Sequence, residues 1–265
     1  FMRGQALPQN HRVLAIVGTR NATRYGLDFL ERLTHGLRGL PVTVLSGMAR
    51  GIDRKAHEAA IFHGLRSDAV VAHGPEQCQP PGNADVGQAL IEHGGAFWSE
   101  HPAGTEPQRA YFAMRNRIIA AMADAVLLVE SGAKGGAMIT AKRAMEYKKP
   151  LFALPGLWYA EKSKGCHLLL KEGQASCVLE PDDIKQSMQW DKLNQARQSN
   201  IFDALDEQEQ LIARALQQKQ QCNLDELAEL LDLSVSSLSS LLTMMELKGM
   251  VQRMAGNYFQ WNWMQ

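Results

Sequence analysis

Short apolar runs alternate with amphipathic helical stretches along the first 154 residues, and this alternation restricts the possible folds. The expected strands cover residues 13–17, 42–45, 69–72, 96–99, 125–129 and 151–154. The expected helices between them cover residues 25–37, 52–63, 83–93, 112–122 and 137–147. Strands that are apolar along their whole length are typical of a parallel sheet buried on both faces. The sequence therefore predicts an α/β fold with a parallel sheet covered by helices.

The last quarter of the chain has a different pattern. Residues 204–217, 224–231 and 234–248 read as three short helices, with Ser234 as a cap and Gly249 as the end of the third. Residues 250–261 read as a hairpin that turns at Gly256-Asn257. Three helices followed by a hairpin predict a small C-terminal winged-helix domain. We expect domains at 1–182 and 204–265, joined by a polar linker at 183–203 that contains at most a short helix.

A net charge of +0 conceals an uneven distribution. Residues 1–199 hold 24 Lys and Arg against 19 Asp and Glu, a balance of +5, whereas residues 200–265 hold 4 against 9, a balance of −5. Such asymmetry concerns binding partners rather than fold. It predicts a basic domain that attracts anions and an acidic domain that does not.

Several classes of protein are disfavoured by what the sequence lacks. We find no run of about 18 apolar residues and no signal-peptide pattern, so we expect a cytoplasmic protein without a membrane span. The four cysteines, at 78, 166, 177 and 222, have no zinc-site spacing and are expected to be free thiols. The eight histidines are scattered and no nucleophile motif is present, so we expect no metal, no cofactor and no catalytic residues. Phe1 precedes Met2, as expected of a fragment.

Two glycine-containing turns follow the first two expected strands. In Gly18-Thr19-Arg20, a glycine lets backbone amides approach a phosphate, which Arg20 can bind, although a tight turn with a surface arginine has the same pattern. The second turn offers Ser46, Gly47 and Arg50 for the same purpose. Asp53 and His57 follow it four residues apart, which favours a structural hydrogen-bonded pair over catalysis.

Two further segments suit a nucleic-acid strand. Phe112 can stack on a base, Arg115 and Arg117 can bind phosphates, and Asn116 can bond a base edge, although a core phenylalanine in an ordinary helix start has the same pattern. The segment from Glu130 to Thr140 carries a glycine loop between a strand and a helix, which is a phosphate cradle. Its candidate residues are Lys134, Gly135 and Gly136, with Lys142 shortly beyond.

Five segments in this order resemble motifs of the DNA-processing protein A (DprA/Smf) family. They are residues 15–20 with Tyr25-Gly26, residues 46–53 with Ala56-His57, Phe112 with residues 115–119, residues 134–141, and residues 152–156. The resemblance covers roughly residues 1–182 and, more weakly, residues 204–261. It implies that the parallel sheet is a Rossmann-like domain.

The resemblance also implies a function. It implies a protein that binds and protects incoming single-stranded DNA, helps to load the RecA recombinase in natural transformation, and dimerises through the Rossmann-like domain. The implied DNA site is a basic pocket at the strand ends, which on this chain includes Arg20, residues 115–117 and the Gly135-Gly136 loop, with Lys134 and Lys142 nearby. The chain departs from the family pattern at Gln79, where a tyrosine is usual, and lacks the helical domain that precedes the Rossmann-like domain in many members.

Two alternatives remain open. The glycine loop also resembles that of phosphoribohydrolases, which implies an enzyme or sensor for a nucleotide derivative, although the glutamate that follows the loop in those enzymes is absent here.

The third helix of the winged-helix domain carries no Lys or Arg between residues 234 and 247, so we expect no tight binding to duplex DNA. The winged-helix domain is therefore either a protein-interaction module or an acidic lid that competes with DNA for the basic domain.

Overall fold

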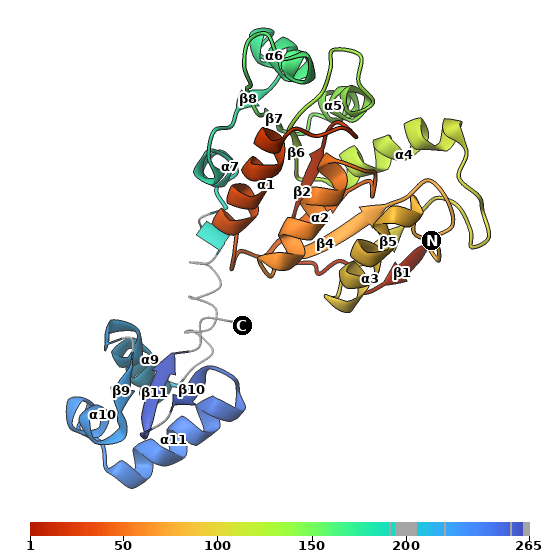
Figure 1. Ribbon diagram of the computed structural model, residues 1–265. Helices are drawn as coiled ribbons and strands as arrows, with labels where there is room; N and C mark the ends of the chain where they lie inside the picture. The colour runs from red at the N-terminus through yellow and green to blue at the C-terminus, as the bar shows by residue number, and fades with distance from the viewer. Residues whose placement is uncertain (191, 194–205, 220, 255, 262–265) are drawn as a thin grey trace. The chain divides into compact units, whose positions relative to one another are not determined.

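The computed structural model describes residues 1–190, 192–193, 206–219, 221–254 and 256–261 (Figure 1). The chain divides into two compact units, Phe1–Leu193 and Asn194–Gln265. We describe each unit by itself.

The described part of the first unit is built on an eight-stranded sheet in the order β1-β5-β4-β3-β2-β6-β7-β8. All neighbouring strands are parallel except β1, which pairs antiparallel with β5 at one edge. The strands are β1 Met2–Gly4, β2 Arg12–Val17, β3 Val42–Ser46, β4 Arg66–Val70, β5 Ala96–Trp98, β6 Ala125–Leu128, β7 Leu151–Ala153 and β8 Ser176–Cys177.

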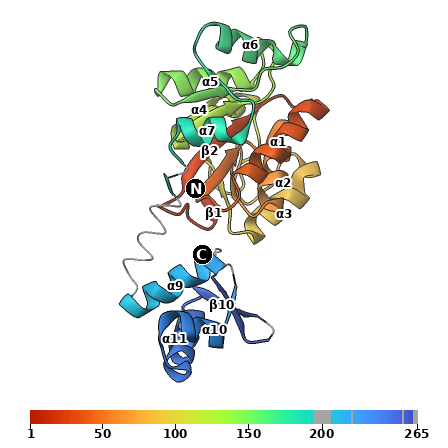
Figure 2. The ribbon, with the colours of Figure 1, turned by 90° about the vertical axis from the view of Figure 1, so that its left-hand side faces the viewer.

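Helices cover both faces of this sheet, with α1, α2 and α3 on one side and α4 and α5 on the other (Figure 2). The helices are α1 Arg24–Gly36, α2 Ile52–Phe62, α3 Ala84–Glu92, α4 Arg109–Met122, α5 Ala137–Glu146, α6 Lys164–Lys171 and α7 Pro181–Ser187, with short 3-10 turns at Pro81–Asn83 and Glu161–Ser163.

The strands are apolar because each contributes to two cores. In β2, Leu14 and Ile16 pack into the core beneath α1 and α2, while Ala15 and Val17 pack into the core beneath α4 and α5. Side chains alternate across a strand, so a strand that is covered on both faces must be apolar at every position. The predicted α/β fold is therefore confirmed.

The strand order reverses direction between β2 and β6. Successive strands from β2 to β5 extend the sheet to one side, and β6 then returns to pair with the other side of β2. In open α/β sheets, ligands bind at such a switch point, beyond the carboxyl ends of the strands. The loops after β2 and β6 begin at Gly18 and Val129, so this is where a site is expected.

Several boundaries differ from those that the sequence predicts. The third strand runs from Arg66 to Val70 rather than over 69–72, and α4 begins at Arg109 rather than at 112. Strands β1 and β8 and helix α6 were not predicted. The first unit continues to Leu193, beyond the predicted domain end at residue 182, and α7 is the short helix that the predicted linker over 183–203 allows. Residues 191 and 194–203 lie outside the described part of the chain.

The second unit has the winged-helix pattern that the sequence predicts. Its elements are α9 Glu207–Lys219, β9 Cys222–Asn223, α10 Leu224–Leu231, α11 Val235–Leu247, β10 Val251–Met254 and β11 Tyr258–Trp261. Its strands pair in the order β10-β11-β9. Ser234 caps α11 by accepting the Ser237 N–H at 3.2 Å, as predicted. A separate apolar core includes Leu216, Leu238 and Phe259.

Among the described helices, none is both long enough and apolar enough to cross a membrane by itself. The pair formed by α10 and α11 meets the length and composition criteria only together, and it is bent by 109° at its junction.

Candidate functional site

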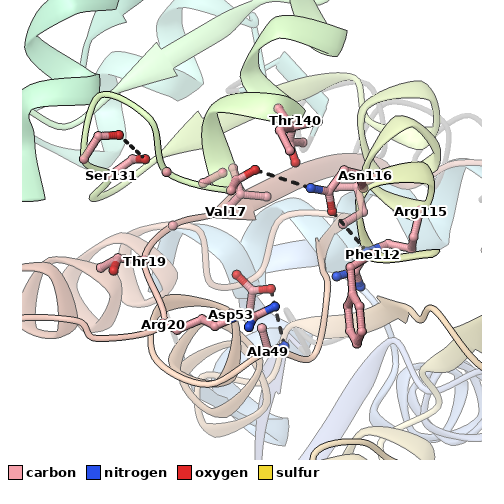
Figure 3. Close-up of a pocket in the computed structure, with 18 of the residues that line it drawn as sticks. Val17, Thr19, Arg20, Ala49, Asp53, Phe112, Arg115, Asn116, Ser131 and Thr140 are labelled. Carbon is pink, nitrogen blue, oxygen red and sulfur yellow. Dashed lines mark hydrogen bonds between the residues drawn. The ribbon is translucent and has the colours of Figure 1, made fainter. Parts of the chain in front are cut away.

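A cavity of about 550 Å³ opens at the switch point, beyond the carboxyl ends of β2 and β6 (Figure 3). The β2–α1 loop, α4, and the loop between β6 and α5 supply most of its lining. Three arginines and one carboxylate belong to this lining, namely Arg20, Arg109, Arg115 and Asp53. The described lining therefore carries an excess of positive charge, which suits an anion.

Backbone contacts hold the β2–α1 loop in place. The Thr19 N–H donates to the Glu130 carbonyl at 2.7 Å, and the Thr19 carbonyl accepts the Ile52 N–H at 3.1 Å. Gly51 adopts a φ of +76°, and a Cβ added there would lie 2.4 Å from the Thr19 carbonyl oxygen. Glycine is needed at 51 for both reasons, and the close approach fixes Gly18, Thr19 and Arg20 at the cavity.

Arg20 and Phe112 form the pair most exposed to a ligand. Arg20 is exposed, and its guanidinium carbon lies 5.7 Å from the centroid of the half-buried Phe112 ring. This cation–π contact orients the guanidinium without consuming its hydrogen-bond donors. The donors of Arg20 can therefore face an anion beside the ring, and phosphate binding by Arg20 stays a prediction.

Arg115 has a different environment from the one predicted. It is 6% exposed, and Nη1 donates to the Gly47 carbonyl at 2.6 Å and to the Val70 carbonyl. Burial lowers the pKa of Arg115 to about 10, the charge of Asp53 raises it, and the charge of Arg20 lowers it further. Arg115 lines the cavity, but its main contacts connect α4 to the ends of β3 and β4.

Asp53 and His57 do not form the predicted hydrogen-bonded pair. Asp53 accepts the Ala49 N–H at 3.4 Å, whereas His57 Nδ1 lies 2.7 Å from the Ser67 hydroxyl. Burial raises the pKa of the Asp53 carboxyl, against the lowering effect of the Arg115 charge. Burial, assisted by Arg115, lowers the pKa of His57 to about 3, so this histidine is neutral at physiological pH. The predicted pairing is therefore wrong: Asp53 contacts the backbone at Ala49, His57 Nδ1 contacts Ser67, and the buried His57 Nε2 has no hydrogen-bond partner among the described residues.

The glycine loop between β6 and α5 forms the opposite wall. The Asn116 side-chain amide donates to the Gly136 carbonyl at 3.4 Å, which links α4 to the loop. A Cβ at Gly135 would lie 2.3 Å from the Ser131 hydroxyl oxygen, so the loop can pass this close only with glycine. No side chain caps the first turn of α5. The start of this helix therefore faces the cavity with its positive dipole end.

The remaining predicted residues lie outside this cavity. Ser46 is buried in the sheet, where its hydroxyl donates to the Ile16 carbonyl at 2.6 Å. Arg117 pairs with Glu100. Lys134 and Lys142 are exposed on the glycine loop and on α5. Gly47 and Arg50 line a neighbouring cavity instead.

That neighbouring cavity, of about 470 Å³, shares Arg20, Ala49 and Phe112 with the first. Its other wall carries Pro80 and Pro107. Phe112 and Arg20 therefore stand at the boundary between two hollows, one lined by more cationic groups and one mainly apolar. Such a boundary suits a strand whose phosphates and bases alternate.

Sequence reasoning missed Arg109, which is exposed at the first residue of α4 and lines the cavity. It also missed the lining residues Ser131, Gly132, Ile139 and Thr140 as contacts. Arg109 lies three residues before Phe112, so on a helix the two side chains share one face. The sequence predicts that this helix starts at residue 112, so Arg109 falls outside the expected helix and this spacing is not used. Within the described residues, no group of three or more His, Cys, Asp or Glu is placed to hold a metal ion.

The chain matches the family model described as DNA recombination-mediator protein A over residues 1–189. It matches the DprA winged helix domain over residues 199–257. It is 37% identical to Protein Smf of Escherichia coli over 190 residues, which is 72% of this chain and 50% of that protein. It is 34% identical to a DNA processing protein DprA of Mycobacterium tuberculosis over 250 residues, 93% of this chain and 64% of that protein. The chain thus spans half to about two thirds of these relatives.

Two solved structures are similar. DprA of Streptococcus pneumoniae superimposes with a TM-score of 0.61 at 34% identity, over 66% of this chain and 60% of that one. DNA processing protein A of Helicobacter pylori, described for its single-stranded DNA binding mode, gives 0.62 at 29% identity, over 68% and 81%. Together with the family-model matches, these similarities confirm the resemblance stated from the motifs. The chain belongs to the DNA recombination-mediator protein A (DprA/Smf) family.

Proposed function

We propose that the first unit binds single-stranded DNA across the cavity at the switch point and its neighbour. Arg20 and Arg109 bind backbone phosphates, the start of α5 adds backbone amides, and Phe112 stacks on a base. Arg115 stabilises the cavity through its bonds to the Gly47 and Val70 carbonyls. Lys134 and Lys142, which are exposed outside the cavity, attract the DNA strand by their charge. The binding is sequence-tolerant, because phosphates and base faces are common to all sequences.

The observation that carries this proposal is the Arg20–Phe112 contact between two cavities. A cation and an aromatic ring side by side provide one contact for a phosphate and one for a base. The single-stranded DNA binding described for the Helicobacter pylori relative supports the same conclusion.

On the scale of the cell, we propose that the protein is a cytoplasmic recombination mediator. It protects incoming single strands, acts as a homodimer through its Rossmann-like unit, and helps to load RecA during natural transformation. No catalytic step is part of this proposal, since the single carboxylate in the described lining, Asp53, is buried and accepts the Ala49 N–H.

The test is a salt titration of binding to fluorescent oligo-dT, beside a duplex of equal length. The logarithm of the affinity should fall against log salt with a slope of about 0.7 per phosphate neutralised. Arg20→Ala and Arg109→Ala should each weaken binding about tenfold or more, as expected for loss of a charge-assisted hydrogen bond. Arg38→Ala, at an exposed arginine in the turn after α1, is the control and should bind like wild type. Wild-type binding by both cavity variants would refute the site.

The wider role has its own measurements. The mass in solution should be twice 29.4 kDa for a homodimer. Addition of the protein should accelerate RecA-dependent strand exchange on single strands that are coated beforehand with a single-strand-binding protein. Release of a free base from a mononucleotide would instead favour the phosphoribohydrolase-like alternative.

A further inference from the structure

A further cavity of about 810 Å³, which we call the second hollow, lies beyond the carboxyl end of β7. It is distinct from the two neighbouring cavities of the candidate site. Its wall includes Tyr25 at the start of α1 and the loop that follows Gly156. Tyr25 lines the hollow and is 49% exposed. Trp158 at 84% and Tyr159 at 62% exposure stand between the lining residues Leu157 and Ala160 without lining the hollow themselves. Neither the fold nor the site described above requires these rings at the surface.

Trp158 and Tyr159 lie on a hydrogen-bonded turn, which we call the aromatic turn (residues 157–160). The Ala160 N–H donates to the Leu157 carbonyl at 2.9 Å and closes the turn. The Tyr25 hydroxyl donates to the Pro155 carbonyl at 2.6 Å and fixes the entry to it. Trp158 and Tyr159 pack edge to face, with ring centroids 5.4 Å apart. The faces of these rings are thus presented in a defined arrangement.

One segment of chain connects this hollow to the candidate site. Gly18, Thr19 and Arg20 line the first cavity. Arg20 also lines a charged groove with Arg24, and Arg24 in turn lines the second hollow with Tyr25. The eight residues from Gly18 to Tyr25 span at most about 27 Å even when extended. A single strand of several nucleotides can therefore reach from one hollow to the other.

The lining of the second hollow carries two cations, Arg24 and Lys162, and two carboxylates, Glu130 and Glu161. Glu130 is buried, where it accepts the Thr23 N–H at 2.8 Å and the Thr23 hydroxyl, so it faces a ligand little. Glu161 is exposed and forms a surface ion pair with Lys164, which adds a third cation beside the hollow. Asp28 pairs with Arg24 at 3.4 Å, but both side chains are exposed, so this ion pair is weak and readily exchanged.

We propose that the aromatic turn, together with Tyr25, stacks on unpaired bases of the same DNA strand beyond the candidate site. This inference rests on the proposed function. Aromatic rings interleaved with cations are the platform that single strands use without regard to sequence. A contact between two copies fits less well, because lysine is depleted at interface cores and a two-fold axis here brings Arg24 and Lys162 towards their own copies.

The experiment compares Trp158→Ala with wild type on dT4, which covers the first site, and on dT20, which reaches the aromatic turn. Trp158→Ala should bind dT20 at least about fivefold more weakly, the lower range for loss of one base stack, and bind dT4 like wild type. Phe62→Ala is the matched control, because Phe62 is 79% exposed at the far end of α2, and it should change neither affinity.

A fluorescence measurement gives an independent readout. The part of the wild-type signal that Trp158→Phe removes should be quenched by dT20 and not by dT4. Equal dT20 affinity for Trp158→Ala and wild type overturns this inference and leaves the proposed function intact. A halved molecular mass for Trp158→Ala also overturns it and assigns the surface to a contact between copies. Failure of the wild type to bind either oligonucleotide overturns both.

Discussion

Arg20 and Arg115 line the same cavity but have opposite environments. Arg20 is exposed and stacked on a ring, whereas Arg115 is buried and bonded to two carbonyls. A Cβ at Gly47 would lie 2.6 Å from the Arg115 guanidinium, so the turn after β3 packs directly against it. One arginine is thus available to a ligand, and the other supports the shape of the site.

Replacing each arginine with alanine should separate these two roles. Arg115→Ala should lower the free energy of unfolding by about 3–5 kcal/mol, since it leaves the buried Asp53 carboxylate without the positive charge that acts on it. Arg20→Ala should change it by less than about 0.5 kcal/mol. Urea unfolding measures both. Equal stability of the two variants would contradict the distinction.

His57 should make the stability depend on pH. Its pKa is about 3 in the folded protein and 6.5 in the unfolded chain, so the unfolded state takes up a proton that the folded state cannot. The contribution of neutral His57 is complete above pH 6.5 and is lost as the pH falls from 6.5 towards 3, by about 1.4 kcal/mol per pH unit. Urea unfolding of wild type and His57→Gln should show a difference in stability that shrinks over this range. A constant difference would exclude His57 as the cause.

At the scale of elements, the sequence predicted the strands that are apolar along their length and the helices whose apolar residues recur at helical spacing. Strand β4 was displaced because Arg66 and Asp68 lie inside it, where the Arg66 guanidinium nitrogen Nε donates to the buried Asp68 carboxylate at 2.9 Å and the Trp98 indole donates to it at 2.8 Å. Charged residues that are paired within a sheet look like loop residues in a sequence. For the same reason, burial of Arg115 could not be deduced from spacing.

The end of the first unit was also concealed by composition. The segment from α7 onward is rich in glutamine, yet Ile184 in α7 and Trp190 after it are buried in the core beneath α1. Two apolar side chains among polar neighbours are too few for a periodicity, but they suffice to attach the segment to the sheet.

Trp190 should therefore stabilise the first unit. Trp190→Ala should lower its free energy of unfolding by about 3–5 kcal/mol, since the indole is 2% exposed. Trp158→Ala is the matched control, because that indole is 84% exposed, and it should cost less than about 0.5 kcal/mol. Circular dichroism during urea unfolding compares the two. A small effect at Trp190 would restore the linker interpretation for this segment.

For the whole molecule, the opposite charge balances of the two parts of the chain support the proposal that the first unit binds the DNA. The exposed positions of α11, at which winged-helix proteins read duplex DNA, carry Ser236, Ser240 and Met244 rather than Lys or Arg. The chain matches the DprA winged helix domain over residues 199–257, so the domain is present. Its acidic character therefore bears on which partner it binds.

Removal of residues 194–265 should leave duplex binding unchanged, because no basic recognition surface is lost. Gel-shift titrations with a duplex and with oligo-dT, on the full chain and the truncated one, test this. Loss of duplex binding in the truncated protein would contradict the prediction. In the same titrations, tighter oligo-dT binding without the acidic unit identifies it as a lid, and unchanged binding identifies it as a module for a protein partner.

The switch point in the strand order also affects how the protein is made. Leu14 of β2 pairs with Ala125 of β6, so one side of the central strand is without its neighbour until 111 further residues have been synthesised. At about 5–20 residues per second, this interval of synthesis lasts roughly 5–20 s. During that time an apolar strand edge is open to other nascent chains. The same topology that creates the cavity therefore exposes the newborn chain to aggregation, and its yield should fall when translation is slowed between β2 and β6.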